Sequence, residues 1–205
     1  MKYLIAVLLA LTIALPSTAN AAWLRSANLW EEVYNGYGSN TYQSGAWRLR
    51  PMSASQPHET HASLVLGKPE MSGNYRLFVQ MTPVAQLRTG STPNPWETGW
   101  ITFGYNPDGT FKYLILKPNG LELGEFLGGY NQNFLYTSSD FLFPIGQQYN
   151  VAIYVKDGWI VTYVNGVRVM RYQMNEQDLL DTAGRFGWYA EDAEVIYANA
   201  NVRQF

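Results

Sequence analysis

The sequence predicts an all-β protein built from two packed antiparallel sheets. Tight-turn signals recur along the chain, namely Asn-Pro-Asp-Gly-Thr at 106–110, Pro-Asn-Gly at 118–120, Asp157-Gly158 and Asn165-Gly166. Gly and Asn supply the positive φ angles of such turns, and Pro presets their entry. The runs between them are rich in aromatic and β-branched residues, which favour strands. Only 175–182 suits a helix, so two sheets are the expected architecture.

The strands are expected in a regular succession after an irregular entry over 23–45 that holds one early strand. The clearest alternation is NYRLFVQM at 74–81. Apolar residues at 75, 77, 79 and 81 alternate with polar ones, and Phe78 is the single apolar residue among the polar positions. The expected strands are 46–50, 61–66, 74–81, 100–105, 111–117, 121–126, 149–156, 159–165, 167–172, 185–190 and 195–203.

The first 21 residues have the pattern of a secretory signal peptide. Lys2 precedes the apolar run 4–15, Pro16 ends that run, and Ala19-Asn20-Ala21 is a typical cleavage pattern. The run is too short to span a bilayer as a helix, which takes about 20 apolar residues. We therefore expect a periplasmic or secreted protein with no membrane span, whose mature part, 22–205, forms a single β-sandwich domain.

Composition narrows the partners. The chain has no cysteine, so an exported fold must depend on its core and sheets rather than on disulfides. Its formal net charge is −2 and it has no long basic run, which argues against a nucleic-acid partner. Aromatic residues make up 15% of the chain, and this content makes an aromatic binding surface a hypothesis to examine.

Two stretches carry a resemblance to a known fold family. The strings YNVAIYVKDGWIVTYVNGVRV (149–169) and GRFGWYAEDAEVIYANANV (184–202) resemble the closing half of concanavalin-A-like lectin/glucanase jelly rolls. The middle of the chain is similar to exported bacterial domains related to the 3-keto-disaccharide hydrolase set. That second similarity lies in SQPHETHASLVLG (55–67), QLR (86–88), NPWETGW (94–100), YLILKPNG (113–120) and ELG (122–124). The resemblance implies a jelly-roll sandwich, a fold that serves enzymes, lectins and adhesion modules alike.

The catalytic signatures of this fold are absent. Glucanases of the fold carry Glu-x-Asp-x-Glu on one strand, and alginate lyases carry Arg-x-Glu-Leu and Gln-Ile-His patterns, none of which occurs in the sequence. A glycosidase needs two carboxyl groups about 5–10 Å apart. Glu97 and Glu122 are the candidate catalytic pair, because turn-based pairing places Glu125 on the opposite face from Glu122.

Pairing the meander 100–126 through its turns predicts two faces. The expected core face carries Ile101, Phe103, Tyr105, Phe111, Tyr113, Ile115, Leu121 and Leu123. The expected binding face carries Trp100, Thr102, Lys112, Leu114, Leu116, Glu122 and Phe126. Sugar rings stack on aromatic planes while polar groups hold their hydroxyls. The candidate substrate-binding residues are therefore Trp96, Trp100 and Lys112, with Tyr189, Glu191 and Asp192 from a rim loop. The alternative is that Trp100 packs under a loop and Lys112 pairs with Glu122 at the surface.

The strands after residue 149 predict a second aromatic face. One face has an aliphatic core set, namely Val151, Ile153, Val155, Ile160, Thr162, Val164, Val167 and Val169. The other has Asn150, Tyr154, Trp159, Val161, Tyr163, Arg168, Met170 and Tyr172. A surface this aromatic is either a binding groove or a wall against the other sheet.

No metal site is expected from the histidines. His58-Glu59-Thr60-His61 lacks the spacing of a His-Glu-x-x-His zinc motif, and alternation directs its two rings to opposite sides. Glu191, Asp192 and Glu194 offer oxygen ligands of the kind that Ca²⁺ takes, with a solvated acidic loop as the alternative. Calcium is thus the one cofactor that the sequence leaves open.

Three function classes remain. The first is an exported carbohydrate-binding, lectin-like domain whose partner is a glycan or polysaccharide. The second is a glycoside hydrolase that uses Glu97 and Glu122 as acid and base. The third is a structural or adhesive envelope protein that turns its aromatic face toward another protein.

Overall fold

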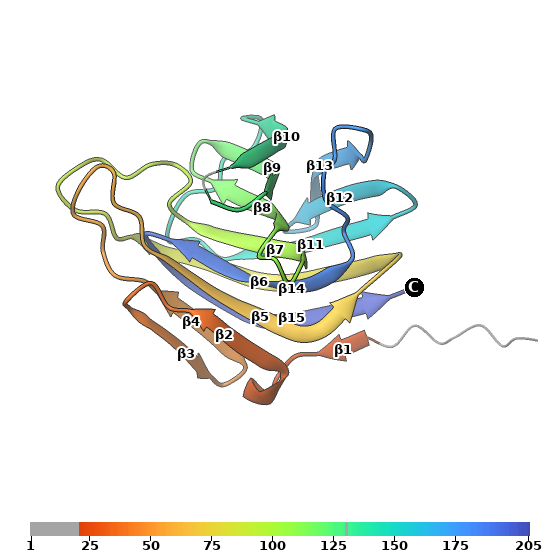
Figure 1. Cartoon of the computed structure of the whole chain (residues 1–205), viewed down its shortest axis with the longest axis horizontal. Helices are drawn as coiled ribbons and strands as arrows, with labels where there is room; N and C mark the ends of the chain where they lie inside the picture. Colours follow the sequence, from red (N-terminus) through yellow and green to blue (C-terminus); the bar gives the residue numbers. More distant parts are fainter. Residues whose placement is uncertain (1–20, 130) are drawn as a thin grey trace, which may run out of the picture.

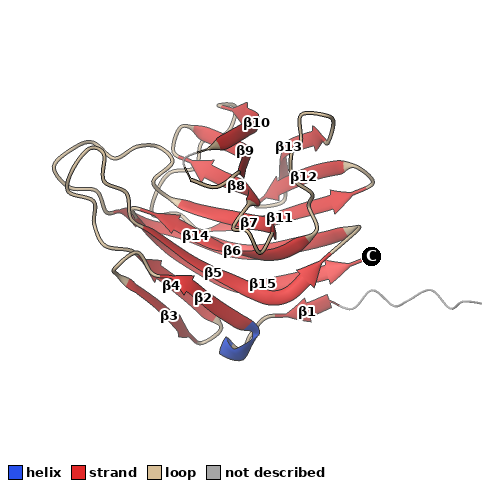
Figure 2. Ribbon diagram, in the orientation of Figure 1, coloured by secondary structure: helices blue, strands red, loops and turns tan. Residues whose placement is uncertain are grey.

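The structure is a computed structural model that describes residues 21–129 and 131–205. The expected signal peptide, apart from Ala21, lies outside the described residues. Strands make up most of the described chain, and the described residues form one short 3-10 helix, η1 (Ala27–Leu29) (Figure 2). No helix in the described part is long and apolar enough to cross a membrane.

The strands form two antiparallel sheets (Figure 1). Sheet A has eight strands, in the order β13 (Val167–Gln173), β12 (Trp159–Val164), β11 (Tyr149–Lys156), β6 (Tyr75–Gln86), β15 (Ala193–Gln204), β4 (Ala46–Arg50) and β3 (Ser39–Gln43), with β1 (Ala21–Trp23) beside β15. Sheet B has seven, in the order β10 (Gln132–Ser138), β9 (Gly120–Phe126), β8 (Phe111–Lys117), β7 (Gly99–Tyr105), β14 (Gly184–Glu191), β5 (Ala62–Met71) and β2 (Trp30–Tyr34). The all-β, two-sheet prediction is confirmed.

The inner faces of the two sheets enclose one apolar core. Alternate residues of β6 and β11 from sheet A and of β7, β8 and β9 from sheet B contribute to it. Aromatic rings fill its wider end, where Trp188 of β14 stacks on Tyr197 of β15 at a centroid distance of 5.1 Å. Side chains that alternate in this way between core and outer face are what the pleat of a strand produces. The outer faces are therefore free to carry other chemistry.

The expected phase of β8 is wrong. Trp100 lies opposite Ile115, and Ile101 lies opposite Leu114, so Leu114 and Leu116 face the core while Phe111, Tyr113 and Ile115 share the outer face with Trp100. A one-residue slip moves every side chain of a strand to the other face. Gly104, with a φ of 60°, interrupts the alternation just before the β7–β8 loop, where Phe103 faces the core and Tyr105 packs on the outer cluster.

The same kind of irregularity affects β13. The pairing between β12 and β13 shifts between Thr162 and Tyr163. Met170 and Tyr172 therefore belong to the core, whereas they were expected on the aromatic outer face, and Val167 is 55% exposed. The expected faces of β11 and β12 agree with the structure.

The expected helix over 175–182 does not form. Its backbone groups bond instead to carboxylates: Leu179 and Leu180 donate their N–H groups to Glu125, and Asn175 donates to Asp178. Asp178 and Glu125 in turn hold Lys112, whose Nζ lies 2.6 Å and 2.5 Å from their oxygens. Side chains that satisfy the backbone locally compete with helix formation.

Lys112 is thus a buried cation at the inner face of sheet B, and not a partner of Glu122. We expect Lys112→Met to lower the free energy of unfolding by about 3–5 kcal/mol, because Glu125 would be left buried without its countercharge. Chemical denaturation measures the change. Lys68→Met removes an exposed lysine and should change stability by no more than about 0.5 kcal/mol. Equal effects of the two substitutions would contradict the structural role of Lys112.

Candidate functional site

A pocket of about 580 Å³ lies over the outer face of sheet B. Its walls come from the strands β7, β8, β9, β10 and β14 and from the loops before β5 and β7. The lining is aromatic in Trp96, Trp100, Phe126, Phe134 and Tyr189, and polar in Thr60, Lys117, Asn119, Glu122, Gln132 and Glu191. A mainly apolar pocket of this size with a few convergent polar groups is the usual form of a small-ligand site.

The floor of the pocket is a packed layer of rings. Trp100, only 2% exposed, lies between Tyr113 and Tyr189 at centroid distances of 4.7 Å to each. Its indole N–H donates to the carbonyl of Trp96 at 2.9 Å, which ties the floor to the rim. Tilted ring pairs at this separation stabilise one another beyond their buried area. Trp100 is therefore a fixed part of the pocket floor.

The rings open to a ligand are at the rim. Trp96 is 44% exposed and Phe134 is 61% exposed, and both line the pocket. Trp96 comes from the loop before β7, and Phe134 comes from β10 at the edge of sheet B. Exposed rings at the rim of such a pocket can cover a flat apolar ligand face, and little side-chain freedom is lost when they do.

Glu122 is held on the pocket side of β9 by two donors. Lys117 Nζ lies 2.6 Å from one of its oxygens, and the Tyr113 hydroxyl donates to the other at 3.1 Å. Gly124 makes this arrangement possible, because a Cβ there would lie 2.4 Å from the Tyr113 hydroxyl oxygen. The carboxylate thus has a fixed orientation before any ligand enters.

Glu191 lines the opposite wall, at the end of β14, where the Tyr189 hydroxyl donates to it at 2.9 Å. The pKa of Glu191 is raised from 4.5 to about 7. Burial is the largest cause and the carboxylates of Asp192 and Glu97 add to it, while the Tyr189 hydrogen bond and the Arg88 charge oppose it. A carboxyl group with a pKa near 7 is poised to exchange a proton at neutral pH.

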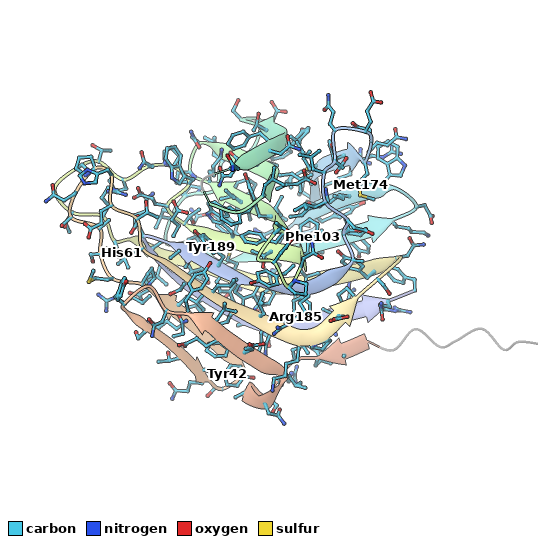
Figure 3. All side chains as sticks on the ribbon, in the orientation of Figure 1. Tyr42, His61, Phe103, Met174, Arg185 and Tyr189 are labelled. Atoms are coloured by element: carbon cyan, nitrogen blue, oxygen red, sulfur yellow. The ribbon has the colours of Figure 1, made fainter. Side chains whose placement is uncertain are left out.

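Beneath this wall lies a buried ion network centred on Arg88. Its guanidinium donates to Glu97 at 2.6 Å and to Asp192 at 3.1 Å, and to the carbonyls of Gln56 and Glu59 at 2.6 and 2.8 Å. The network joins the loop before β5, the loop before β7 and the β14–β15 turn. These loops project beyond the ends of the sheets, close to His61 (Figures 1 and 3). The wall that carries Trp96 and Glu191 is built on these contacts.

The structure brings together five of the eight predicted site residues. Those that line the pocket are Trp96, Trp100, Glu122, Tyr189 and Glu191. Glu97 and Asp192 are fully buried in the Arg88 network, and Lys112 is fully buried on the inner face of β8. These three therefore support the fold around the pocket in this structure, and they do not line it.

Several pocket residues escaped the sequence prediction. Ile115 and Lys117 would have been found from the correct phase of β8, because they alternate with Leu114 and Leu116. Gln132 and Phe134 lie on β10, a strand that was not expected. The alternation of polar and aromatic residues in QNFLYTS, 132–138, was the available signal for that strand.

The three carboxylates suggested for Ca²⁺ do not point to one place. Glu191 lines the pocket, Asp192 accepts hydrogen bonds from Arg88 and from the backbone N–H of His61, and Glu194 pairs with Arg48 and Arg50. Among the residues that the structure describes, no group of three or more His, Cys, Asp or Glu side chains could hold a metal ion.

Comparison with known proteins identifies the fold. No protein-family model matches the chain, and no curated protein matches its sequence. The solved structure of carbohydrate-binding module CBM66 from Bacillus subtilis is similar with a TM-score of 0.64 and 12% identity, over 84% of this chain and 93% of that one. The VIP36 exoplasmic/lumenal domain, in its Ca²⁺/Man3GlcNAc-bound form, gives 0.60 and 12% over 92% and 90%.

A third similar structure is an enzyme. A prokaryotic β-1,3-1,4-glucanase (lichenase) derived from a mouse hindgut metagenome has a TM-score of 0.57 and 12% identity, over 91% of this chain and 99% of that one. At identities this low, the structural similarity shows a shared fold and does not show a shared activity. The expected concanavalin-A-like jelly-roll fold is confirmed: this chain has the fold shared by that carbohydrate-binding module and that glucanase.

The raised pKa of Glu191 predicts how stability depends on pH. Between 4.5 and about 7 the folded chain keeps a proton on Glu191 that the unfolded chain has lost, so the free energy of unfolding contributed by this group falls as pH rises and levels off above 7. Glu191→Gln should lack this decline. Denaturation of both proteins at intervals from pH 4 to 8 makes the comparison, and parallel profiles would refute the raised pKa.

Proposed function

We propose that this protein is a carbohydrate-binding, lectin-like β-sandwich and that its ligand occupies the pocket over sheet B. The observation that carries the proposal is the exposed ring of Trp96 beside fixed polar groups in a pocket of about 580 Å³. Two similar structures, a carbohydrate-binding module and a Man3GlcNAc-bound domain, support it by analogy of fold.

The lining suits a sugar by its chemistry. A pyranose has an apolar C–H face, which stacks on an aromatic ring such as Trp96 or Phe134, and a rim of hydroxyls that both donate and accept hydrogen bonds. Glu122 offers acceptors, Lys117 offers donors, and the amides of Asn119 and Gln132 offer both. Because Glu122 is already oriented by Lys117 and Tyr113, little ordering of this group is required on binding.

The same proposal includes export. The pattern of residues 1–21 supports delivery to the periplasm or the medium, where polysaccharides are accessible. The absence of cysteine in the chain fits this compartment only if core and sheets supply the stability, as the single core between the two sheets does.

Replacing Trp96 tests the binding site. We expect Trp96→Ala to weaken glycan binding at least about tenfold while the fold remains, since exposed aromatic contacts carry a large share of binding energy and this ring is not part of the core. Native electrophoresis through gels that each contain one polysaccharide identifies the ligand class, and calorimetry then gives the affinity.

The matched control is Trp23→Ala, which removes an exposed indole from β1 in sheet A. It should bind as the unchanged protein does. Equal affinity of the Trp96→Ala variant would exclude this pocket as the site. If no polysaccharide slows the protein in the gel and the protein self-associates as its concentration rises, a structural or adhesive role is favoured instead.

A second function, glycoside hydrolysis, is favoured by one observation. Glu191, with its pKa near 7, and Glu122, with its Lys117 partner, line the same pocket in different environments. Carboxyl groups whose environments differ in this way can divide the roles of acid and base. In this proposal Glu191 donates its proton to the leaving glycosidic oxygen as the bond to the anomeric carbon breaks. Glu122 accepts a proton from the water molecule that attacks the anomeric carbon. Glu191 thereby replaces the buried Glu97 of the sequence-based pair.

Glu191→Gln distinguishes the two functions. If the protein is an enzyme, this substitution should reduce hydrolysis at least about a hundredfold, because general acid catalysis contributes about 10²–10⁴ in rate. Glu176→Gln serves as the comparison, because Glu176 is an exposed carboxylate that does not line the pocket. Cleared zones in polysaccharide gels measure activity, and binding with no clearing by the unchanged protein would rule out hydrolysis of that polymer.

A further inference from the structure

A second hollow lies on the opposite side of the sandwich, over the outer face of sheet A. Its volume is about 770 Å³, and its walls come from β6, β11, β12 and β13. Of these, β11, β12 and β13 are the strands expected to form the second aromatic face, and β6 adds Phe78 to it. The rings of Phe78, Tyr154, Trp159 and Tyr163 line it, so this face is a groove and does not pack against the other sheet.

The groove exists because a small residue stands between two rings. Ala152 of β11 pairs with Phe78 on one side and with Tyr163 on the other. Neighbouring strands are about 4.8 Å apart, so the two rings stand roughly 10 Å apart over a methyl group. Tyr154 packs edge-on against Tyr163 at 5.8 Å and closes one side. The result is a slot with aromatic walls and a shallow floor.

The charges in the groove are mostly positive. Arg76, Lys156 and Arg171 line it against one carboxylate, Asp157, although the chain as a whole has a net charge of −2. Within the described residues none of the three cations lies within ion-pairing distance of a carboxylate, whereas the buried Lys112 and Arg88 are both paired. The lining therefore has cationic groups available to a ligand.

Two of these cations are held in place. The Arg171 guanidinium lies over the Trp159 ring at 3.9 Å from its centroid. Arg76 donates to the side chain of Asn201, while its Nε is buried and has no hydrogen-bond partner among the described residues. The hydrogen bond to Asn201 fixes the direction of the guanidinium on this face of the sheet.

We propose that this groove binds an acidic polysaccharide, carboxylated or sulfated, at a site separate from the pocket over sheet B. Guanidinium groups bind carboxylate and sulfate oxygens with paired, charge-assisted hydrogen bonds, and rings stack on the sugar between the acidic groups. The strands that carry the four rings, β6, β11 and β12, are internal to the sheet, and only β13, which contributes Arg171, is at its edge. An extended peptide cannot add to them through its main chain, which disfavours acidic peptides as occupants.

The test uses the full mature chain and five polymers, in calorimetry or gel retardation: two acidic polysaccharides, their neutral counterparts, and poly-L-glutamate as an acidic peptide. The acidic probes are polygalacturonate and dextran sulfate, and their neutral counterparts are methyl-esterified polygalacturonate and dextran. We expect binding to at least one acidic probe, weaker binding to its neutral counterpart, and a loss of at least about tenfold in Arg171→Gln. Trp96→Ala should leave this affinity unchanged, so the outcome does not depend on the sheet B pocket.

The matched control is Arg25→Gln. Arg25 is exposed and lies over the ring of Trp23 at 4.8 Å, so the substitution removes the same charge from a similar arginine–tryptophan pair elsewhere. An equal loss in this control would mean that net charge alone attracts the polymers, and would overturn the proposal. Two other results would also overturn it: no binding to either acidic probe, and equally tight binding of poly-L-glutamate.

Discussion

The buried Arg88 guanidinium is the interaction on which the candidate pocket depends. A cation without solvent must have nearly all its donors partnered, since an unpaired buried charge costs several kcal/mol. The partners of Arg88 come from three segments far apart in sequence: the carbonyls before β5, Glu97 before β7, and Asp192 at the β14–β15 turn. The observed arrangement of these loops supplies acceptors to Nε, Nη1 and Nη2 of Arg88. Trp96 and Glu191 are the neighbours in sequence of Glu97 and Asp192, which bind Arg88. The position of the pocket wall therefore depends on the hydrogen bonds of Arg88, although Arg88 does not line the pocket.

The floor of the pocket is rigid because the middle strands of sheet B are buried on both faces. The inner face packs on the core, and the outer face carries a second, smaller cluster of Trp100, Phe111, Tyr113 and Ile115. Close packing of such rings resists small displacements. The hydroxyl of Tyr113, a member of this cluster, donates to Glu122 and holds it in place. The hydroxyl of Tyr189, which packs on Trp100, holds Glu191 in the same way. Both carboxyl groups are thereby oriented from below, while the rim rings stay accessible.

Much of the fold could be predicted from local signals, and much of the site could not. Turn residues and period-2 alternation placed β4, β8 and β11 at their observed bounds, because both signals act within a few residues. The phase of β8 depends on a single glycine, Gly104, whose positive φ interrupts the alternation between core-facing Phe103 and outward-facing Tyr105. The Arg88–Asp192 contact spans 104 positions, and no local pattern reveals it. The strings around 55–67, 86–88 and 94–100 stood out in the sequence separately, and the structure shows that they meet in one network.

The two outer faces of the sandwich differ in chemistry although the same alternation produces them. Over sheet B two carboxyl groups face a single lysine, whereas over sheet A three cations face a single carboxylate. The core separates the two surfaces, which point away from each other, so one short segment of polymer cannot contact both. Sites this far apart with no shared residues contribute nearly additively. If each face binds a glycan, occupancy of one leaves the other free, and a chain of this size joins two polysaccharide strands. Its avidity would then come from geometry, because the tether between the two sites is the rigid core itself.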